Sequence, residues 1–211
     1  GAFPLSKRGF FLVLEGLDGV GKSHLARQLE ATLQSVRPVL RTEEPQVDCC
    51  AGQFLRQVLT RKRQADVWTQ ALAFAANRAD HNARIIAPFL REHPDGLLLC
   101  DRYVLSSLVY QARDGVSFAR VLALNERARR PDLTIFLDAP ADTLSERQRD
   151  RQEGRELYDG QLALWRSRYE EAIVVLRERG ERIIQLDAAL VPDALLDAVL
   201  NALQGEEEPH G

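Results

Sequence analysis

Methionine is absent from the sequence, cysteine is scarce, and there is no excess of positive charge. The formal net charge of the 211 residues is −3, which argues against a surface built for general binding to nucleic acid or to a membrane. The three cysteines are Cys49, Cys50 and Cys100. An odd number with an adjacent pair predicts neither a disulfide framework nor a CxxC zinc site. We therefore expect a reducing, cytoplasmic setting.

Long hydrophobic runs are missing as well. The runs FFLVLE (10–15) and LLLC (97–100) are the longest, whereas a transmembrane helix needs roughly 18 apolar residues. The first residues, GAFPLSKRG, lack the apolar stretch of a secretory signal. Since the initiator methionine is absent, we expect 1–9 to be an N-terminal extension, either processed or artificially added. We expect one domain over 10–204 and a disordered, charged tail at 205–211.

The sequence does show an alternation of short apolar runs and longer amphipathic stretches. Continuous apolar runs suit strands that are buried on both faces of a parallel sheet. Five such runs are found at 10–15, 38–42, 97–100, 133–138 and 182–186. Helical patterns lie at about 22–36, 66–92, 117–129, 140–150, 159–179 and 191–204. This order predicts a doubly wound α/β fold, in which helices flank a five-stranded parallel sheet and ligands bind at the carboxyl ends of the strands.

A phosphate-binding motif follows the first predicted strand. Residues 16–23 read GLDGVGKS and match the G-x-x-x-x-G-K-[ST] pattern of P-loop NTPases. Glycines let the backbone curl around phosphate oxygens, and the next helix directs its N-terminus at the same anion. We expect Lys22 to contact the β- and γ-phosphates of ATP and Ser23 to ligate Mg²⁺. The predicted nucleotide-binding positions are Gly16, Gly19, Gly21, Lys22, Ser23 and His24.

Further motifs follow the P-loop in the same chain. The segment CDRYVLSSLVYQ (100–111) resembles the DRY-x-x-SS-x-x-YQ motif of the thymidylate kinase family. FAANRADH (74–81) and PDLTIFLD (131–138) are similar to two other segments of that family, and VLEGLDGVGKS is similar to its P-loop. The order agrees over residues 10–187. The resemblance implies a homodimeric kinase of dTTP biosynthesis that transfers the γ-phosphate of ATP to dTMP, with Mg²⁺.

The residue types and the resemblance together suggest how the acceptor is held. Asp101 ends an apolar strand, where a carboxylate can hold Mg²⁺ through its waters, and Arg102 can clamp the acceptor phosphate bidentately. Phe74 and Arg78 lie four residues apart and share a helix face. By resemblance, Phe74 stacks on thymine and Arg78 donates to its O4. The plain alternatives are a surface ion pair at a strand end and core packing of the phenyl ring.

Other substrate contacts are implied by the resemblance. It places Gln111 near the base, and Tyr110 beside the sugar, where a 2′-hydroxyl would clash. It places Asp18, inside the P-loop, near the 3′-hydroxyl of the acceptor. Ser107 belongs to the same predicted substrate-binding set, although helix capping explains its pattern equally well. We interpret His81 as a structural residue.

One loop departs from the family pattern. The family commonly shows TREPGGT after its second strand, whereas this chain reads TEEPQVDCC (42–50). Glu44 and Pro45 keep their places, but Glu43 stands where the arginine would be and the glycine pair is replaced. Three explanations stay open: simple divergence of the loop, an acceptor other than dTMP, or recruitment of the cysteine pair for redox control.

A basic segment is expected to supply charge that the P-loop lacks. In one class of the family an arginine follows the P-loop aspartate, and here that position is Gly19. The segment ERQRDRQEGRELYD (146–159) resembles the lid of the class that has glycine in the loop. The alternative is a solvated, charged helix end. The lid contains Arg147, Arg149, Arg151 and Arg155, and the predicted catalytic residues are Arg151, Arg155, Lys22 and Arg102.

The sequence thus predicts a dTMP kinase on a P-loop NTPase fold. Because the acceptor phosphate is already anionic, in-line transfer needs positioning and charge stabilisation rather than a strong base. Two alternatives stay open: a kinase of another nucleoside or nucleoside monophosphate, and a P-loop NTPase or nucleotide-binding module without an acceptor. The pocket around Phe74, Arg78 and Gln111 distinguishes dTMP from the other acceptors of the first alternative. Phosphorylation of any acceptor distinguishes a kinase from the NTPase or binding module of the second.

Overall fold

The computed structural model describes residues 9–140 and 161–207. The strands are β1 (Phe10–Glu15), β2 (Val39–Glu43), β3 (Leu97–Asp101), β4 (Leu133–Asp138) and β5 (Ile183–Asp187). The helices are α1 (Lys22–Leu33), α2 (Cys50–Leu59), α3 (Val67–His81), the π-helix η1 (Asn82–Ile86), α4 (Ala87–Glu92), α5 (Val104–Gln111), α6 (Phe118–Leu124), α8 (Leu162–Glu178) and α9 (Pro192–Glu207). The predicted helix at 140–150 and the predicted lid at 146–159 lie outside the described residues, except for residue 140.

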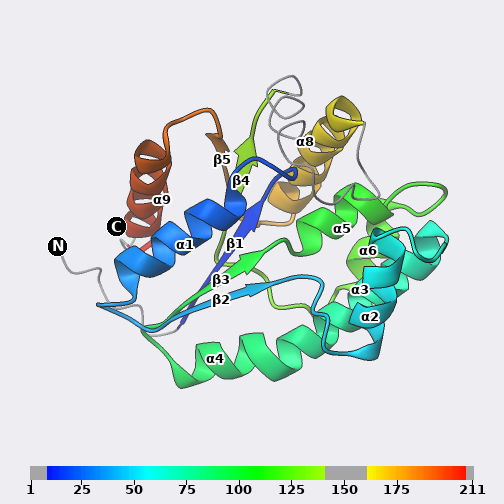
Figure 1. The fold of residues 1–211 in the computed structure, drawn as a ribbon, viewed down its shortest axis with the longest axis horizontal. Coiled ribbons are helices and arrows are strands. Elements are labelled where there is room, and N and C mark those ends of the chain that lie inside the picture. The colour runs from blue at the N-terminus through cyan, green and yellow to red at the C-terminus, as the bar shows by residue number, and fades with distance from the viewer. Residues whose placement is uncertain (1–8, 141–160, 208–211) are drawn as a thin grey trace.

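The five strands form one parallel sheet in the order β2-β3-β1-β4-β5 (Figure 1). Every residue of β1 is buried, as expected of a central strand that is covered on both faces. Each predicted strand is found, and its ends are shifted by at most one residue. The predicted fold class, a doubly wound P-loop α/β domain with a five-stranded parallel sheet, is confirmed.

Helices cover both faces of the sheet. α1 packs on β1, β2 and β3 and lies beside α9, as the left side of Figure 1 shows. α4 packs on β3 from the other side of the sheet, and α5 packs against α8. The arrowheads of β2 and β3 point toward the side of Figure 1 that carries α2, α3 and α5. Within the described ranges, none of the helices combines the length and hydrophobicity that crossing a membrane requires.

The helix boundaries differ from the sequence prediction in several places, and α1 and α6 end earlier than expected, at Leu33 and Leu124. The pattern at 66–92 is divided into α3, η1 and α4, which follow one another directly. α2 was not predicted, because its N-cap is Cys49, whose Sγ accepts a hydrogen bond from the Gly52 backbone N–H at 3.4 Å. Helix N-caps are usually Ser, Thr, Asp or Asn, so a thiol cap gives no sequence signal. α9 continues to Glu207, and the predicted tail boundary at 205 therefore falls inside a helix.

The strand order brings two motifs to one edge of the sheet. Leu14 of β1 pairs with Asp101 at the end of β3, and Glu15 pairs with Phe136 of β4. The P-loop leaves β1 at this edge, and the segment that begins with Asp101 leaves β3 beside it. Two motifs that are far apart in the sequence thus meet because β1 and β3 are neighbours.

Gly16 lies where the end of β1 passes close to β4. Its φ is +143°, and a Cβ built on it would approach the Leu137 carbonyl oxygen to 2.5 Å. Backbone contacts this close are possible for glycine because it has no side chain. The first glycine of the motif therefore serves the packing of the P-loop against β4.

We predict that Gly16→Ala lowers the free energy of unfolding by about 1–3 kcal/mol, because the new methyl group meets backbone that cannot move away. Urea denaturation measures this difference. The control is Gly205→Ala in α9, where a Cβ meets nothing within 4 Å. That variant should gain up to about 1 kcal/mol from helix propensity. A Gly16→Ala protein as stable as the wild type would contradict the close packing.

Candidate active site at the carboxyl edge of the sheet

The P-loop surrounds a buried lysine. The Nζ of Lys22 donates to the carbonyl oxygens of Gly16 at 2.8 Å and Leu17 at 3.2 Å. Burial lowers the pKa of Lys22, and the nearby Arg102 lowers it further, while the carboxylate of Asp101 acts in the opposite direction. The lysine is thus held inside the loop by partners that a phosphate can replace.

The N-terminus of α1 is prepared for an anion. Gly21, at the N-cap, has a φ of +101° and offers no side-chain cap to the first backbone N–H groups. Ser23 and His24 are exposed in the first turn. Uncapped N–H groups at a helix N-terminus are a ready binding site for phosphate. Gly19 has a φ of +83°, a conformation that an arginine at this position would adopt only with strain.

Arg102 stands at the centre of the site. Its φ is +67°, and its backbone N–H donates to the Leu14 carbonyl oxygen at 2.9 Å, which ties it to β1. Its Nη2 pairs with the Asp18 carboxylate at 2.8 Å, and its guanidinium lies 5.5 Å from the centre of the Tyr110 ring. Three residues that the sequence assigned to the acceptor are therefore in contact: Asp18, Arg102 and Tyr110.

Asp101 has a spare ligand atom. Its Oδ1 is buried and forms no hydrogen bond with any described residue. A carboxylate oxygen without a donor, close enough to Lys22 to affect its pKa, suits a divalent cation. The residues present thus fit the predicted magnesium site, with the exposed Ser23 hydroxyl as the second protein ligand.

The predicted base-binding residues differ in their surroundings. Phe74 is half-buried on α3. Arg78, one turn later, is buried and donates from Nη1 to the Ser107 hydroxyl at 3.0 Å. Gln111 is buried, and its Oε1 accepts no hydrogen bond from the described residues. The structure thus brings Arg78 and Ser107 together and leaves the Gln111 carbonyl oxygen available to a donor.

Sequence reasoning missed Glu15, which is fully buried at the end of β1. Its Oε1 accepts from the backbone N–H groups of Tyr103 at 2.8 Å and Ser106 at 3.0 Å. Its Oε2 accepts from the Ser106 hydroxyl at 2.7 Å and the Tyr169 hydroxyl at 3.0 Å. Burial raises the pKa of Glu15, and the positive charge of Arg102 counteracts this. The available signal was a charged residue that closes the apolar run FFLVLE.

The divergent loop at 42–50 contributes to the fold in two ways. Glu44 is buried and pairs with Arg78 Nε at 2.7 Å. Cys49 caps α2 and accepts from the Asn77 amide at 3.3 Å, whereas Cys50 is exposed. The structure therefore gives the first cysteine a capping role, and a redox role for the pair stays a prediction.

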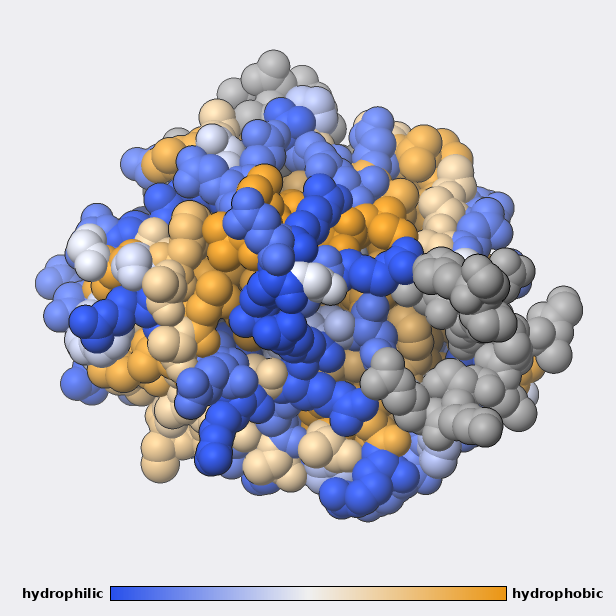
Figure 2. Space-filling view, turned by 180° about the vertical axis from the view of Figure 1, so that it is seen from behind, coloured by the Kyte–Doolittle hydropathy of each residue, from blue (hydrophilic) through white to orange (hydrophobic). Residues whose placement is uncertain are grey.

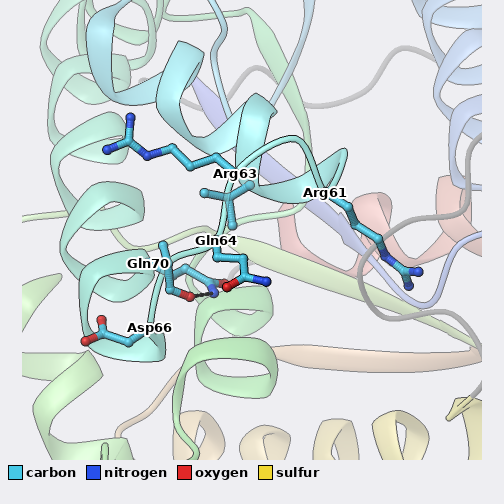
Figure 3. Close-up of a pocket in the computed structure, with 7 residues that line it drawn as sticks. Arg61, Arg63, Gln64, Asp66 and Gln70 are labelled. Atoms are coloured by element: carbon cyan, nitrogen blue, oxygen red, sulfur yellow. Dashed lines mark hydrogen bonds between the residues drawn. The ribbon is translucent and has the colours of Figure 1, made fainter.

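A pocket of about 590 Å³ lies elsewhere, between the end of α2 and the start of α3 (Figure 3). Polar residues line it, and Arg61 and Arg63 point in different directions. The Nε2 of Gln70 donates to the Ala65 carbonyl oxygen at 2.9 Å. None of the residues predicted to bind nucleotide or acceptor lines this pocket, so we do not assign the reaction to it.

We predict that Glu15→Ala lowers the free energy of unfolding by about 3 kcal/mol or more, because buried donors lose their acceptor. Glu15→Gln should lose less, about 1–2 kcal/mol, since its amide oxygen still accepts from the two backbone N–H groups. Denaturation in urea at constant m-value gives both numbers. Equal stability of the alanine variant and the wild type would show that the network is not a stabilising element.

Comparison with known proteins places this site in a family. The family model described as thymidylate kinase matches residues 14–199. A probable thymidylate kinase of Pyrococcus horikoshii is 40% identical over 139 residues, which cover 63% of this chain and 66% of that protein. The chain thus matches just under two thirds of this relative's length.

Two bacterial relatives match over more of their length. The thymidylate kinase of Pelotomaculum thermopropionicum is 34% identical, with 92% of this chain and 97% of that protein covered. The thymidylate kinase of Limosilactobacillus fermentum is 35% identical, with 85% and 87% covered. Since the match includes the P-loop, the DRY segment and β4, the chain belongs to the thymidylate kinase family.

Proposed function

We propose that the chain transfers the γ-phosphate of ATP to dTMP and releases ADP and dTDP. The observation that carries this proposal is the contact between the P-loop and the DRY segment, where Asp18 pairs with Arg102 at 2.8 Å. A donor-phosphate loop and an acceptor-phosphate clamp are held at adjoining strand ends. This arrangement suits in-line transfer between two bound nucleotides.

On the donor side, the phosphates of ATP occupy the P-loop. The backbone N–H groups at the start of α1 hold phosphate oxygens, and Lys22 exchanges its carbonyl partners for the β- and γ-phosphates. An ammonium group kept in a buried loop stabilises charge strongly, because little water competes for it.

On the acceptor side, Arg102 grips the phosphate of dTMP. Its Nη2 pairs with Asp18, so the guanidinium is already oriented toward the P-loop. A phosphate, which accepts two parallel hydrogen bonds, replaces that partner. Asp18 then contacts the 3′-hydroxyl of the acceptor.

The base is read by residues of α3 and α5. Phe74 stacks on the ring, and Arg78 donates to the carbonyl at position 4. Gln111 has a buried Oε1 that accepts no hydrogen bond from the described residues, which suits the N3–H of thymine. Tyr110 is buried beside Arg102. We place it beside the sugar, where a 2′-hydroxyl would clash with it. Together these groups favour a pyrimidine deoxynucleotide with a carbonyl at position 4.

Asp101 and Ser23 would hold Mg²⁺, since one Asp101 carboxylate oxygen has no hydrogen-bond partner among the described residues. When bound, the ion neutralises charge on the phosphate oxygens of ATP. The protein groups position the two phosphates in line and exclude water from the space between them.

We propose a homodimer that forms through α3. Trp68 and Leu72 are large hydrophobic residues with 38% and 42% of their surface exposed, and they lie four residues apart on one face of the helix. In Figure 2 hydrophobic surface gathers on the side that carries α2, α3 and α6, which is the left side of that view. Exposed hydrophobic surface of this kind is typical of an interface.

A cytoplasmic location stays a prediction from cysteine usage.

We expect dTMP to be phosphorylated with a kcat/KM at least ~10²-fold above those of dCMP, AMP and GMP, because buried donors and acceptors are mismatched by the other bases. ADP release with ATP, Mg²⁺ and each acceptor measures this. Lys22→Ala is the control for the site of transfer and should lower kcat/KM by ~10² or more. Equal turnover with another of these nucleotides would sink the dTMP assignment, and ATP hydrolysis without any acceptor would favour a plain NTPase.

We predict that Arg151→Ala or Arg155→Ala lowers kcat by at least ~10², with little change in the KM for dTMP, because the lid contact matters in the transition state. Arg147→Ala and Arg149→Ala are the matched controls from the same segment. Steady-state kinetics of the four variants gives the comparison. If all four keep kcat within about threefold, a change below ~1 kcal/mol, the lid assignment is wrong.

A further inference from the structure

The guanidinium of Arg78 is held by three elements. Its side chain is 2% exposed, and its Nε donates to Glu44 Oε1 at 2.7 Å. Its Nη1 donates to Ser107 at 3.0 Å and to Asn125 Oδ1 at 2.8 Å. The partners come from the loop after β2, from α5 and from the end of α6. The Nη2 group forms no hydrogen bond with any described residue.

The carboxylate that holds Arg78 is itself held by His81. Glu44 Oε2 is 2.8 Å from His81 Nδ1, and both side chains are almost fully buried. His81 Nε2 lies 2.7 Å from the Thr42 hydroxyl, which also accepts from the Gln46 amide at 3.2 Å. A polar chain therefore runs from β2 through His81 and Glu44 to Arg78.

The hydrogen-bond pattern assigns one tautomer to His81. An ionised Glu44 can only accept, so Nδ1 carries the proton. In a neutral imidazole Nε2 can then only accept, so the Thr42 O–H donates to it while the Thr42 oxygen accepts from the Gln46 amide. A neutral imidazole with its proton on Nδ1 thus satisfies every member of the chain, and the remaining charges, Glu44 and Arg78, balance.

A metal ion is the other ligand that these residues suggest. The ligand atoms of Glu44, His81 and Cys100 lie within 4.8 Å of one another. Both imidazole nitrogens already have partners, however, and the Arg78 cation sits on the same carboxylate. Burial raises the pKa of the Cys100 thiol well above its ordinary value, so the thiol stays protonated. Hydrogen bonding, and not metal binding, explains the cluster.

We propose that His81 is a positioning residue that fixes Glu44 and thereby directs the Nη2 edge of Arg78 toward the pyrimidine. The inference rests on the proposed function, in which Arg78 reads the carbonyl at position 4. A side chain as long as arginine has several rotamers, and a carboxylate anchored from behind restricts it to one. The discrimination between thymine and cytosine then depends on His81, although His81 touches neither.

Two substitutions of His81 separate the role of its Nδ1 from the role of its Nε2. Asn at position 81 places an amide N–H near the former Nδ1 and keeps the donor to Glu44. Gln reaches the former Nε2, keeps a contact with Thr42 and loses that donor. We expect His81→Gln to raise the KM for dTMP about tenfold or more and to reduce the preference for dTMP over dCMP by a similar factor. His81→Asn should retain the preference. The KM for ATP should not change in either variant.

The measurement is steady-state kinetics with dTMP, dCMP and ATP on the full chain, with His93→Gln as the control for loss of an imidazole elsewhere. Equal effects of Asn and Gln at position 81, or an unchanged preference in His81→Gln, would overturn the proposal. A wild type that does not prefer dTMP would instead overturn the proposed function. Nitrogen-15 NMR of the histidines tests the hydrogen bonds of His81 independently of substrate. The Nδ1–H tautomer is expected for His81, and a mixture of tautomers would contradict the proposed hydrogen-bond pattern.

Discussion

The buried carboxylate of Glu15 is the contact on which the geometry of the active site depends. It ends the central strand and accepts hydrogen bonds from two backbone N–H groups and two hydroxyls. A charge in this position would be very costly without such partners. Because the partners belong to the DRY segment, α5 and α8, one side chain joins the P-loop to the acceptor clamp.

At the carboxyl edge of the sheet, each cationic side chain has a partner that a bound phosphate can replace. Lys22 is bonded to P-loop carbonyl oxygens and Arg102 to Asp18. Each cation is therefore desolvated and oriented before a phosphate arrives, and the phosphate replaces a partner that binds less strongly. Asp101 keeps an oxygen without a hydrogen bond from the described residues and lies close enough to Lys22 to affect its pKa, which fits a site completed by Mg²⁺.

The divergent loop after β2 fits the same scheme. Glu44, which is retained from the family pattern, contacts Arg78 and His81. The residues that depart from it include Cys49, whose thiol caps α2. Glu43, at the end of β2, and the residues before α2 diverge, whereas the buried contacts of Glu44 with Arg78 and His81 are kept. This argues for simple divergence of the loop among the three explanations that the sequence leaves open.

The sequence by itself determined the five strands and the P-loop, because apolar runs and a motif of fixed spacing are local patterns. The expected burial on both faces holds for β1, β3 and β4 but is wrong for β2 and β5, which are the edge strands of the sheet and are partly exposed. It also determined that Asp101 ends a strand and that Arg102 follows it. The lid residues lie outside the described structure, so their roles stay predictions. The thiol cap of α2 was not predictable, since cysteine is not a usual N-cap.

Only the tertiary structure decided which side chains hold the site together. The partners of Arg78 lie 34, 29 and 47 residues away along the chain, and Asp18 and Arg102 are separated by 84. No local pattern specifies such pairs. They follow from strand order, which places β3 beside β1, and from the need of each buried charge for a partner once water has been excluded.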